Sequence, residues 1–219
     1  YSDNDIYNVF SPQSWGVYTF WAGAADASGN HALANFKNGR WTTYNMRDER
    51  QPGSFAADYK FSSLGLFVQD TWYMSPNLTL SFGLRGDRAD VSPNPAYNAL
   101  AHQVFGYDNS EVVAGKFLVQ PRFGFNYTFD SERPMQMRGG FGLFQGDSPQ
   151  VWLSNSFATT GYNYIQYTKS AYDPTLPFSP DGSNQPVPPS ATSGVINVNM
   201  TGDGFKLPSI WKANLAFDT

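Results

Sequence analysis

The sequence predicts an all-β chain, an antiparallel transmembrane β-barrel segment with long extracellular loops. Three observations carry this prediction: strand-length stretches that alternate between apolar and polar residues, short turns that join them in pairs, and long polar segments between the pairs. A half-buried soluble strand also alternates, because successive side chains point to opposite faces. Clean alternation over about 9 to 11 residues, however, matches the length that a tilted strand needs to cross a bilayer. One face would then contact lipid and the other a polar lumen.

The most regular alternation lies in two neighbouring strands, Phe117–Phe129 and Met135–Phe144, which are joined by the turn Asp130–Pro134. Between their apolar positions stand Arg, Gly, Asn, Thr and Gln. The apolar positions are Phe123, Phe125, Tyr127 and Phe129 before the turn, and Met135, Met137, Gly139, Phe141 and Leu143 after it. The shared pattern on both sides of the turn predicts an antiparallel hairpin.

A second hairpin is predicted from Leu64–Met74 and Leu78–Arg85, joined by Ser75–Asn77, a turn in which Pro presets φ and Asn tolerates a left-handed backbone. The second strand alternates strictly. In the first strand the alternation is less regular, because Asp70 falls on the apolar face and Phe67 on the polar one. The apolar face is formed by Leu66, Val68, Trp72, Leu78, Leu80, Phe82 and Leu84.

A fifth strand, Trp211–Thr219, repeats the alternation, and Gly16–Trp21 and Trp41–Arg47 are two further strand candidates. The connections Ala89–Lys116 and Gly146–Phe205 are long and rich in Pro, Gly, Asn, Ser and Asp. Loops of that length are unusual inside a compact soluble domain. In an outer-membrane barrel they have an ordinary place, because the periplasmic turns are short and the extracellular loops long.

Composition excludes several other classes. No apolar run of about 18 residues occurs, which excludes a transmembrane helix. The chain has no Cys, so a disulfide framework and a thiolate metal site are excluded. A net charge of −4 gives no basic footprint for nucleic acid. Aromatic residues make up 17% of the chain, and Trp72, Tyr73, Tyr127 and Trp211 are expected in the aromatic girdles of a barrel.

Two segments carry a resemblance to a known family. Phe67–Trp72 reads FVQDTW, and Leu78–Asp87 reads LTLSFGLRGD. Together they resemble the QD-x-W and LTL-x-x-GLR-x-D hairpin of TonB-dependent outer-membrane transporters. Five further segments, in the same order over most of the chain, are similar to the Oar-like branch of that family: Gly16–Phe20, Ala34–Gly39, Gln120–Phe125, Arg138–Gly142 and Pro208–Lys212.

The resemblance implies a large barrel with a plug domain, energised by the TonB complex, that moves a bulky solute across the bacterial outer membrane. No plug, TonB-contact segment or terminal aromatic strand is recognised, so residues 1–219 are expected to be a partial outer-membrane β-barrel domain, without a signal peptide and with the loop-like Tyr1–Asn8 at its start. The expected partners are outer-membrane lipid, the TonB complex through parts of the parent protein that are absent here, and an unknown substrate. Nucleic acid is not expected.

Metal ligands are not expected. His31 and His102 have no second ligand at a spacing such as i, i+4. Asp3, Asn4 and Asp5, and separately Asp203, supply oxygen atoms, but neither group matches the spaced acidic loop of a calcium site. Solvated carboxylates are therefore the preferred interpretation, with calcium as the alternative.

Catalytic residues and cofactors are not expected either. Asp87 and Asp90 follow the end of a predicted strand and are not interpreted as an acid/base pair, and no Ser, His and Asp set offers a nucleophile with a base. Gly139, Gly140 and Gly142 lie inside a strand pattern without a following helix, so they do not form a nucleotide-binding loop.

Three arginines, Arg85, Arg122 and Arg138, fall on the polar face. Like charges inside one lumen need carboxylate partners or an anionic ligand. Acidic groups of a plug are the preferred partners, since large transporters of this kind have a plugged lumen.

The long segment Gly146–Phe205 is the predicted recognition loop. Its ligand-binding candidates are Trp152, Tyr162, Tyr164 and Tyr167, because such rings offer rigid contact area among adaptable polar neighbours. The alternative is that these rings fold over the barrel mouth and serve structure alone. The competing function for the whole chain is a secreted or surface β-sheet adhesin or carbohydrate-binding module, which would hide its apolar strand faces in a core.

Overall fold

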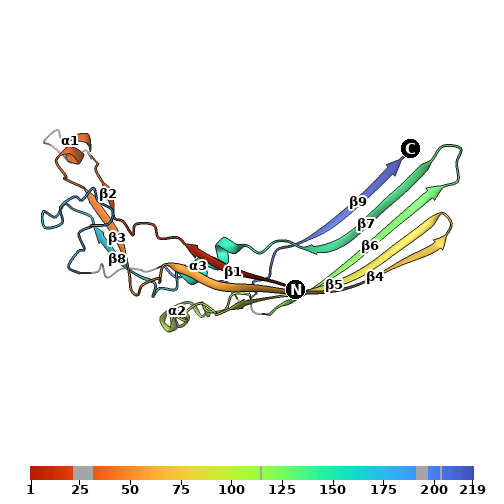
Figure 1. Cartoon of the computed structure of the whole chain (residues 1–219), viewed down its shortest axis with the longest axis horizontal. Coiled ribbons are helices and arrows are strands. Elements are labelled where there is room, and N and C mark those ends of the chain that lie inside the picture. The colour runs from red at the N-terminus through yellow and green to blue at the C-terminus, as the bar shows by residue number, and fades with distance from the viewer. Residues whose placement is uncertain (22–31, 114, 191–196, 203) are drawn as a thin grey trace.

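The computed structural model describes residues 1–21, 32–113, 115–190, 197–202 and 204–219. Its main feature is a curved antiparallel sheet of six strands in the order β1-β4-β5-β6-β7-β9 (Figure 1). The strands are β1 (Ser2–Val9), β4 (Ala56–Ser75), β5 (Leu78–Ser92), β6 (Phe117–Phe129), β7 (Met135–Gln145) and β9 (Ser209–Asp218). The predicted antiparallel β architecture is therefore confirmed.

A second, smaller sheet lies at the other end of the molecule, to the left in Figure 1. It consists of β2 (Val17–Thr19), β3 (Thr43–Glu49) and β8 (Tyr164–Lys169) in the order β2-β3-β8. The described residues form three short helices: α1 (Ala32–Lys37) between β2 and β3, and α2 (Ala99–Phe105) and α3 (Gln150–Ala158) in the two long connections. None of the described helices is long and apolar enough to span a bilayer.

Both predicted hairpins are present. β4 ends at Ser75 and β5 begins at Leu78, while β6 ends at Phe129 and β7 begins at Met135. The paired strands are antiparallel in both cases, and β9 adds to β7 in the same sense. Gly16–Trp21 and Trp41–Arg47 do contain strands, but β2 and β3 belong to the small sheet and add nothing to the large one.

The register of the large sheet separates its side chains into an apolar and a polar face. Asp70 shares the apolar face and Phe67 the polar one, as predicted. Tyr73 lies opposite Thr79 on the polar face, so its expected place in an aromatic girdle is wrong. We call the apolar face of β4 to β9 the apolar belt; it contains Leu66, Val68, Trp72, Leu80, Phe82, Leu84, Phe123, Phe125, Tyr127, Phe129, Met135, Met137, Phe141, Leu143, Trp211, Leu215 and Phe217.

The apolar belt is not covered by other described parts of the chain. None of its members belongs to either buried core cluster. Leu66 is 69% exposed, Phe141 53% and Trp211 62%. A β-sandwich would have covered these side chains with a second sheet, because two sheets pack face to face. An exposed belt is instead the pattern of strands that contact lipid.

β4 is longer than predicted. Along its length the face that is polar in the second half becomes apolar in the first half, and the apolar face becomes polar. In its first half, Tyr59 and Phe61 project from the face that carries Gln69 further on, and they are buried. Tyr59 stacks on Phe157 of α3, with ring centroids 4.4 Å apart. The loop-side core around them contains Ala57, Ala89, Val91, Val112, Val113 and Leu153. Helix α3 therefore covers the long-loop end of the polar face.

The expectation that Tyr1–Asn8 is a loop is wrong, because these residues supply most of β1. β1 pairs with the first half of β4 over its whole length. Lys60 of β4 lies 3.3 Å from Asp3 and 3.6 Å from Asp5. Asp and Asn are depleted in strands, so the composition of this segment did not predict a strand. The pairing with β4 stabilises it.

The expectation of one long loop over Gly146–Phe205 also needs correction, since this segment supplies α3 and β8. The core of the small sheet contains Trp41, Tyr44, Met46, Tyr167 and Leu176. The Trp41 indole donates to the Leu176 carbonyl at 2.9 Å. Burial raises the pKa of the Tyr44 hydroxyl well above its usual value, so this group stays protonated and donates to the Pro186 carbonyl at 2.9 Å.

Candidate functional site

The polar face of the large sheet carries the candidate site, and the register arranges it in rows that cross the strands. One row places Gln69, Gly83, Arg122, Gly142 and Lys212 side by side. The next row toward the short turns consists of Thr71, Ser81, Gly124, Gly140 and Asn214. Most of these positions carry short side chains or none. The two basic residues, Arg122 and Lys212, therefore project beyond their neighbours on this face.

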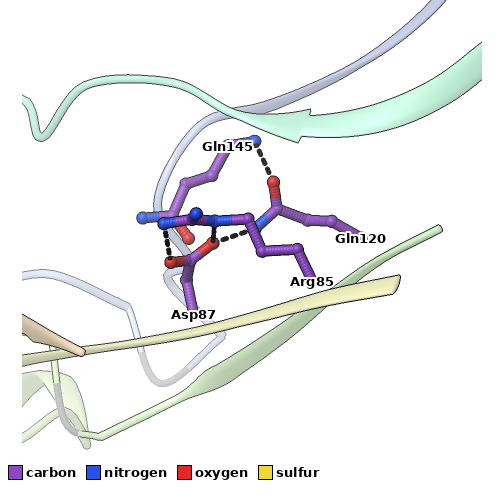
Figure 2. Close-up of polar contacts among 4 residues, drawn as sticks. All are labelled: Arg85, Asp87, Gln120 and Gln145. Atoms are coloured by element: carbon purple, nitrogen blue, oxygen red, sulfur yellow. Dashed lines mark hydrogen bonds and ion pairs between the residues drawn. The ribbon is translucent and has the colours of Figure 1, made fainter. Parts of the chain in front are cut away.

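A polar cluster lies at the end of this face that is nearest the long connections (Figure 2). Arg85 Nε donates to Asp87 Oδ2 at 2.7 Å, and a second guanidinium nitrogen donates to Asp87 Oδ1 at 2.8 Å. Gln120 Nε2 also donates to Asp87, and Gln120 Oε1 of the same side-chain amide accepts from the backbone N–H of Gln145 at 2.9 Å. Asp87 is 5% exposed and Gln120 1%. Such two-pronged charged contacts are both strong and geometrically specific.

Gly65 makes room for this cluster. It lies opposite Asp87 in the neighbouring strand β4. A Cβ atom at position 65 would lie 2.5 Å from a guanidinium nitrogen of Arg85 and would also collide with the Asp87 carboxylate. The absence of a side chain at Gly65 is therefore a condition for the Arg85–Asp87 pair.

The three predicted inward arginines have different partners. Arg85 pairs with Asp87 of its own strand, and Arg138 lies 3.2 Å from Asp218 of β9. The expectation that both pair with acidic groups of a plug is wrong, because the sheet itself supplies the carboxylates. Arg122 pairs with no described carboxylate; its guanidinium lies over the Phe144 ring, 4.7 Å from the centroid.

Lys212 joins Arg122 at the same ring. Its ammonium lies 5.8 Å from the centroid of Phe144. Gly142 lies beneath, and a Cβ there would be 3.2 Å from both Arg122 Cγ and Phe144 Cε2. Beside Arg122 the face is hollowed by a shallow depression of about 160 Å³, lined mainly by Gln69, Ser81, Gly83 and Gly124. Sequence reasoning missed Phe144 and Lys212, although Phe144 breaks the alternation and so offered a signal.

A sheet with one apolar face and one polar, charged face fits a position between lipid and water. The profile of the outer membrane beta barrel domain family matches residues 1–219. The chain belongs to this family. No curated protein and no solved structure matches it. The barrel domain is thus an outer-membrane domain, and by the rule for such barrels its short turns face the periplasm and its long connections the exterior.

The apolar belt of the barrel domain carries aromatic residues at both ends. Trp72 and Tyr127 lie near the short turns, and Trp211 lies near the long connections. Aromatic girdles at the two interfaces flank the lipid-facing band of outer-membrane barrels. These three of the four predicted girdle residues therefore lie on the face that contacts lipid.

The four predicted ligand-binding rings of the barrel domain do not form one surface. Tyr164 and Tyr167 are buried, at 3% and 8% exposure, and Tyr167 belongs to the core of the small sheet. Arg47 lies over the Tyr164 ring, 4.4 Å from its centroid. Trp152 on α3 and Tyr162 before β8 are exposed, at 64% and 45%. A recognition role stays a prediction for these two, whereas the two buried rings serve packing.

The metal candidates of the barrel domain are spread out. His31 and Asp203 lie outside the described residues. His102 is on α2, next to the Tyr97 ring at 6.0 Å. Asp3 and Asp5 share one lysine in the ion pairs of β1. In the part of the chain that the structure describes, no three His, Cys, Asp or Glu residues are grouped to hold a metal ion.

The catalytic candidates lie apart as well. Asp87 and Asp90 are both inside β5, which continues to Ser92, and they project from opposite faces because they are an odd number of residues apart. Gly139, Gly140 and Gly142 lie inside β7, as the sequence predicts. The absence of catalysis and of a cofactor stays a prediction.

Proposed function

We propose that this barrel domain is part of a TonB-dependent outer-membrane transporter that moves a bulky solute across the outer membrane. The observation that carries the proposal is the predominance of glycine and other small residues on part of the polar face. Gly83, Gly124, Gly140 and Gly142 lie in two adjacent rows of this face, beside Ser81 and Thr71. Small barrels fill their interior with side chains, whereas wide barrels leave an aqueous or plugged lumen. An inner face in which most positions carry short side chains or none favours the wide kind.

The polar cluster supports the proposal through the sequence that forms it. Arg85 and Asp87 are the charged residues of the GLR-x-D stretch that resembles the transporter hairpin. Their spacing of two places both side chains on the polar face of one strand, where they pair with each other. In this stretch the arginine and the aspartate thus neutralise each other on the lumen-facing side of the strand.

The proposed partners are outer-membrane lipid at the apolar belt, the TonB complex through other parts of the parent protein, and a solute of unknown identity. Nucleic acid is not a proposed partner. The exposed rings of Trp152 and Tyr162 are the proposed first contacts of the solute on the outer side. Deleting Tyr162 to Pro189 would be a poor test of this role, because the deletion removes β8 and with it a strand that pairs with β3.

Comparative analysis of spent growth medium tests the transport proposal. Cells with the intact gene, cells without it and cells without TonB would grow in the same complex medium, and the remaining solutes would be measured by mass spectrometry. We expect at least one solute to be depleted by the intact cells and retained by both deletion strains. Point variants Trp152→Ala and Tyr162→Ala should slow its depletion without changing the amount of barrel in the membrane.

Two outcomes would contradict the proposal. Depletion that needs this protein but not TonB would indicate a passive pore. Identical media from all three strains, together with a loss of surface attachment in the gene deletion, would favour the adhesin function instead.

A further inference from the structure

Two basic residues on the polar face have no acidic partner in the described structure. The ion pairs of this face join Arg85 to Asp87 and Arg138 to Asp218. No described carboxylate forms an ion pair with Arg122 or with Lys212. Among the described residues, the polar face therefore pairs Arg85 and Arg138 with carboxylates and leaves Arg122 and Lys212, in a row between them, without one.

The two uncompensated charges lie near the same aromatic ring, that of Phe144. Arg122 and Lys212 lie in the same row, on strands that flank β7, with Gly142 between them. Adjacent strands are about 4.8 Å apart, so the two backbones are separated by roughly 10 Å. Both charged groups nevertheless lie within 5.8 Å of the Phe144 ring centroid. Gly142 permits this approach, because it adds no side chain between the two.

Physical chemistry favours an anion at this point. Two like charges that share one aromatic ring repel each other, and the ring attracts each of them only modestly. Ionisable residues in membrane-spanning segments face an aqueous interior and mark pathways of substrates or ions. The planar guanidinium of Arg122 offers parallel donors that match a carboxylate or a phosphate. Lys212 adds a second point charge from β9, the strand on the other side of β7.

We propose that Arg122 and Lys212, on either side of Phe144, form a binding site for a doubly charged anionic group, a phosphate monoester or a dicarboxylate, of a solute in the lumen. The proposal rests on the proposed transport function for the source of its ligand. Lipid phosphates are not the intended ligand, because both basic side chains project from the face opposite the apolar belt.

The test uses the complete protein, purified in a mild detergent and titrated calorimetrically with inorganic phosphate at pH 8, where the ion carries two charges. We expect saturable binding that weakens at least tenfold in the double variant Arg122→Gln, Lys212→Gln. The conservative variant Lys212→Arg should retain binding. The matched control is Arg138→Gln, which removes a cation of the same face that already has a carboxylate and should leave phosphate affinity unchanged.

Heat-modifiable migration on gels would establish that each variant is folded before it is titrated. Equal phosphate affinity in the wild type and the double variant, or no binding to the wild type because an acidic protein segment already occupies the site, would overturn the proposal. Repeating the titration in liposomes with and without lipid A separates the two phosphate sources. Loss of phosphate binding in the presence of lipid A would assign the site to a lipid headgroup and overturn the solute assignment.

The outcome is distinguishable from that of the transport experiment. Phosphate binding that depends on Arg122 and Lys212, without any TonB-dependent solute depletion, would leave the site intact and remove the transport function. Solute depletion that persists in the double variant, without phosphate binding, would leave the transport function intact and remove the anion site.

Discussion

Gly65 and Gly142 lie beneath the charged side chains of the polar face and permit their geometry. Gly65 lies under the Arg85–Asp87 pair, and Gly142 under the contact of Arg122 with Phe144. Neither has a positive φ, so their role is space and not backbone conformation. Glycine weakens a strand interior unless another group must approach the backbone closely, and in both places a charged side chain does so.

Gly65→Ala should destabilise the barrel, whereas Gly83→Ala should not. A Cβ at position 65 collides with Arg85 and Asp87, and displacing the partly exposed Arg85 leaves the buried Asp87 carboxylate poorly satisfied. We expect a loss of about 1–3 kcal/mol in the free energy of unfolding for Gly65→Ala. At Gly83 the nearest atoms are 3.7 Å from the added Cβ, an ordinary contact. Unfolding in guanidinium, followed by tryptophan fluorescence, measures both, and equal midpoints would contradict the role of Gly65.

Phe125→Arg and Asn126→Arg compare the two faces of β6 at neighbouring positions. Phe125 belongs to the apolar belt, and Asn126 lies on the polar face opposite Arg138. An arginine that faces lipid near the bilayer midplane costs about 2–4 kcal/mol. Phe125→Arg should therefore impair assembly of the complete protein, while Asn126→Arg should be far milder. The fraction of heat-modifiable barrel in outer-membrane extracts measures assembly, and equal fractions would refute the assignment of the faces.

Strand β4 passes from lipid into water and changes the environment of both its faces on the way. Val68 belongs to the apolar belt and is 67% exposed, whereas Lys60, on the same face, pairs with Asp3 and Asp5. Over the same length the opposite face passes from Gln69 to the buried ring of Tyr59. The rule that one face is apolar therefore holds only within the bilayer. Outside it, the inner face packs against α3 and the outer face is solvated.

Cysteine labelling in intact cells tests this passage, and the chain has no native Cys to interfere. Asp58 and Val68 are an even number of residues apart on β4 and so share a face. Asp58→Cys should react with a membrane-impermeant maleimide, because it lies on the outer side in water. Val68→Cys should stay unlabelled until detergent removes the lipid. Labelling of Val68→Cys in intact cells would show that this part of β4 is outside the bilayer.

At the scale of the whole molecule, one sheet combines three environments: lipid at the apolar belt, a polar face with charged residues, and a covered core beneath the outer connections. Four of the six tryptophans lie in different surroundings of the molecule. Trp72 and Trp211 lie on the apolar belt, at 55% and 62% exposure, while Trp41 is fully buried in the core of the small sheet. Trp152 is exposed on α3.

Fluorescence quenching in liposomes should separate these environments. In variants that retain a single tryptophan, brominated lipid chains should quench Trp72 and Trp211, and iodide in water should quench Trp152. Trp41 should respond weakly to both quenchers. Quenching of Trp152 by brominated lipid, or of Trp72 by iodide alone, would be incompatible with the position of the bilayer across the apolar belt.

The strands that cross the bilayer can be predicted from the local alternation of apolar and polar residues alone. In Phe117–Phe129 the predicted and observed bounds agree, and both hairpin turns lie where they were predicted. The physical reason is that lipid favours an apolar side chain at every position of the face that contacts it. A local period of two is then sufficient to identify the strand, its facing and the antiparallel pairing across a short turn.

The structure outside the bilayer and the contacts of the inward charges, by contrast, depend on long-range pairing and could not be predicted from the sequence. β1 and β8 depend on partners distant in the sequence, Tyr164 and Tyr167 are buried by packing that no local pattern reveals, and the meeting of Arg122 with Lys212 depends on the register of three strands. In water the solvent imposes no alternation on a loop. Which residues meet there is set by long-range pairing, and for Arg122 and Lys212 that pairing produced the candidate site.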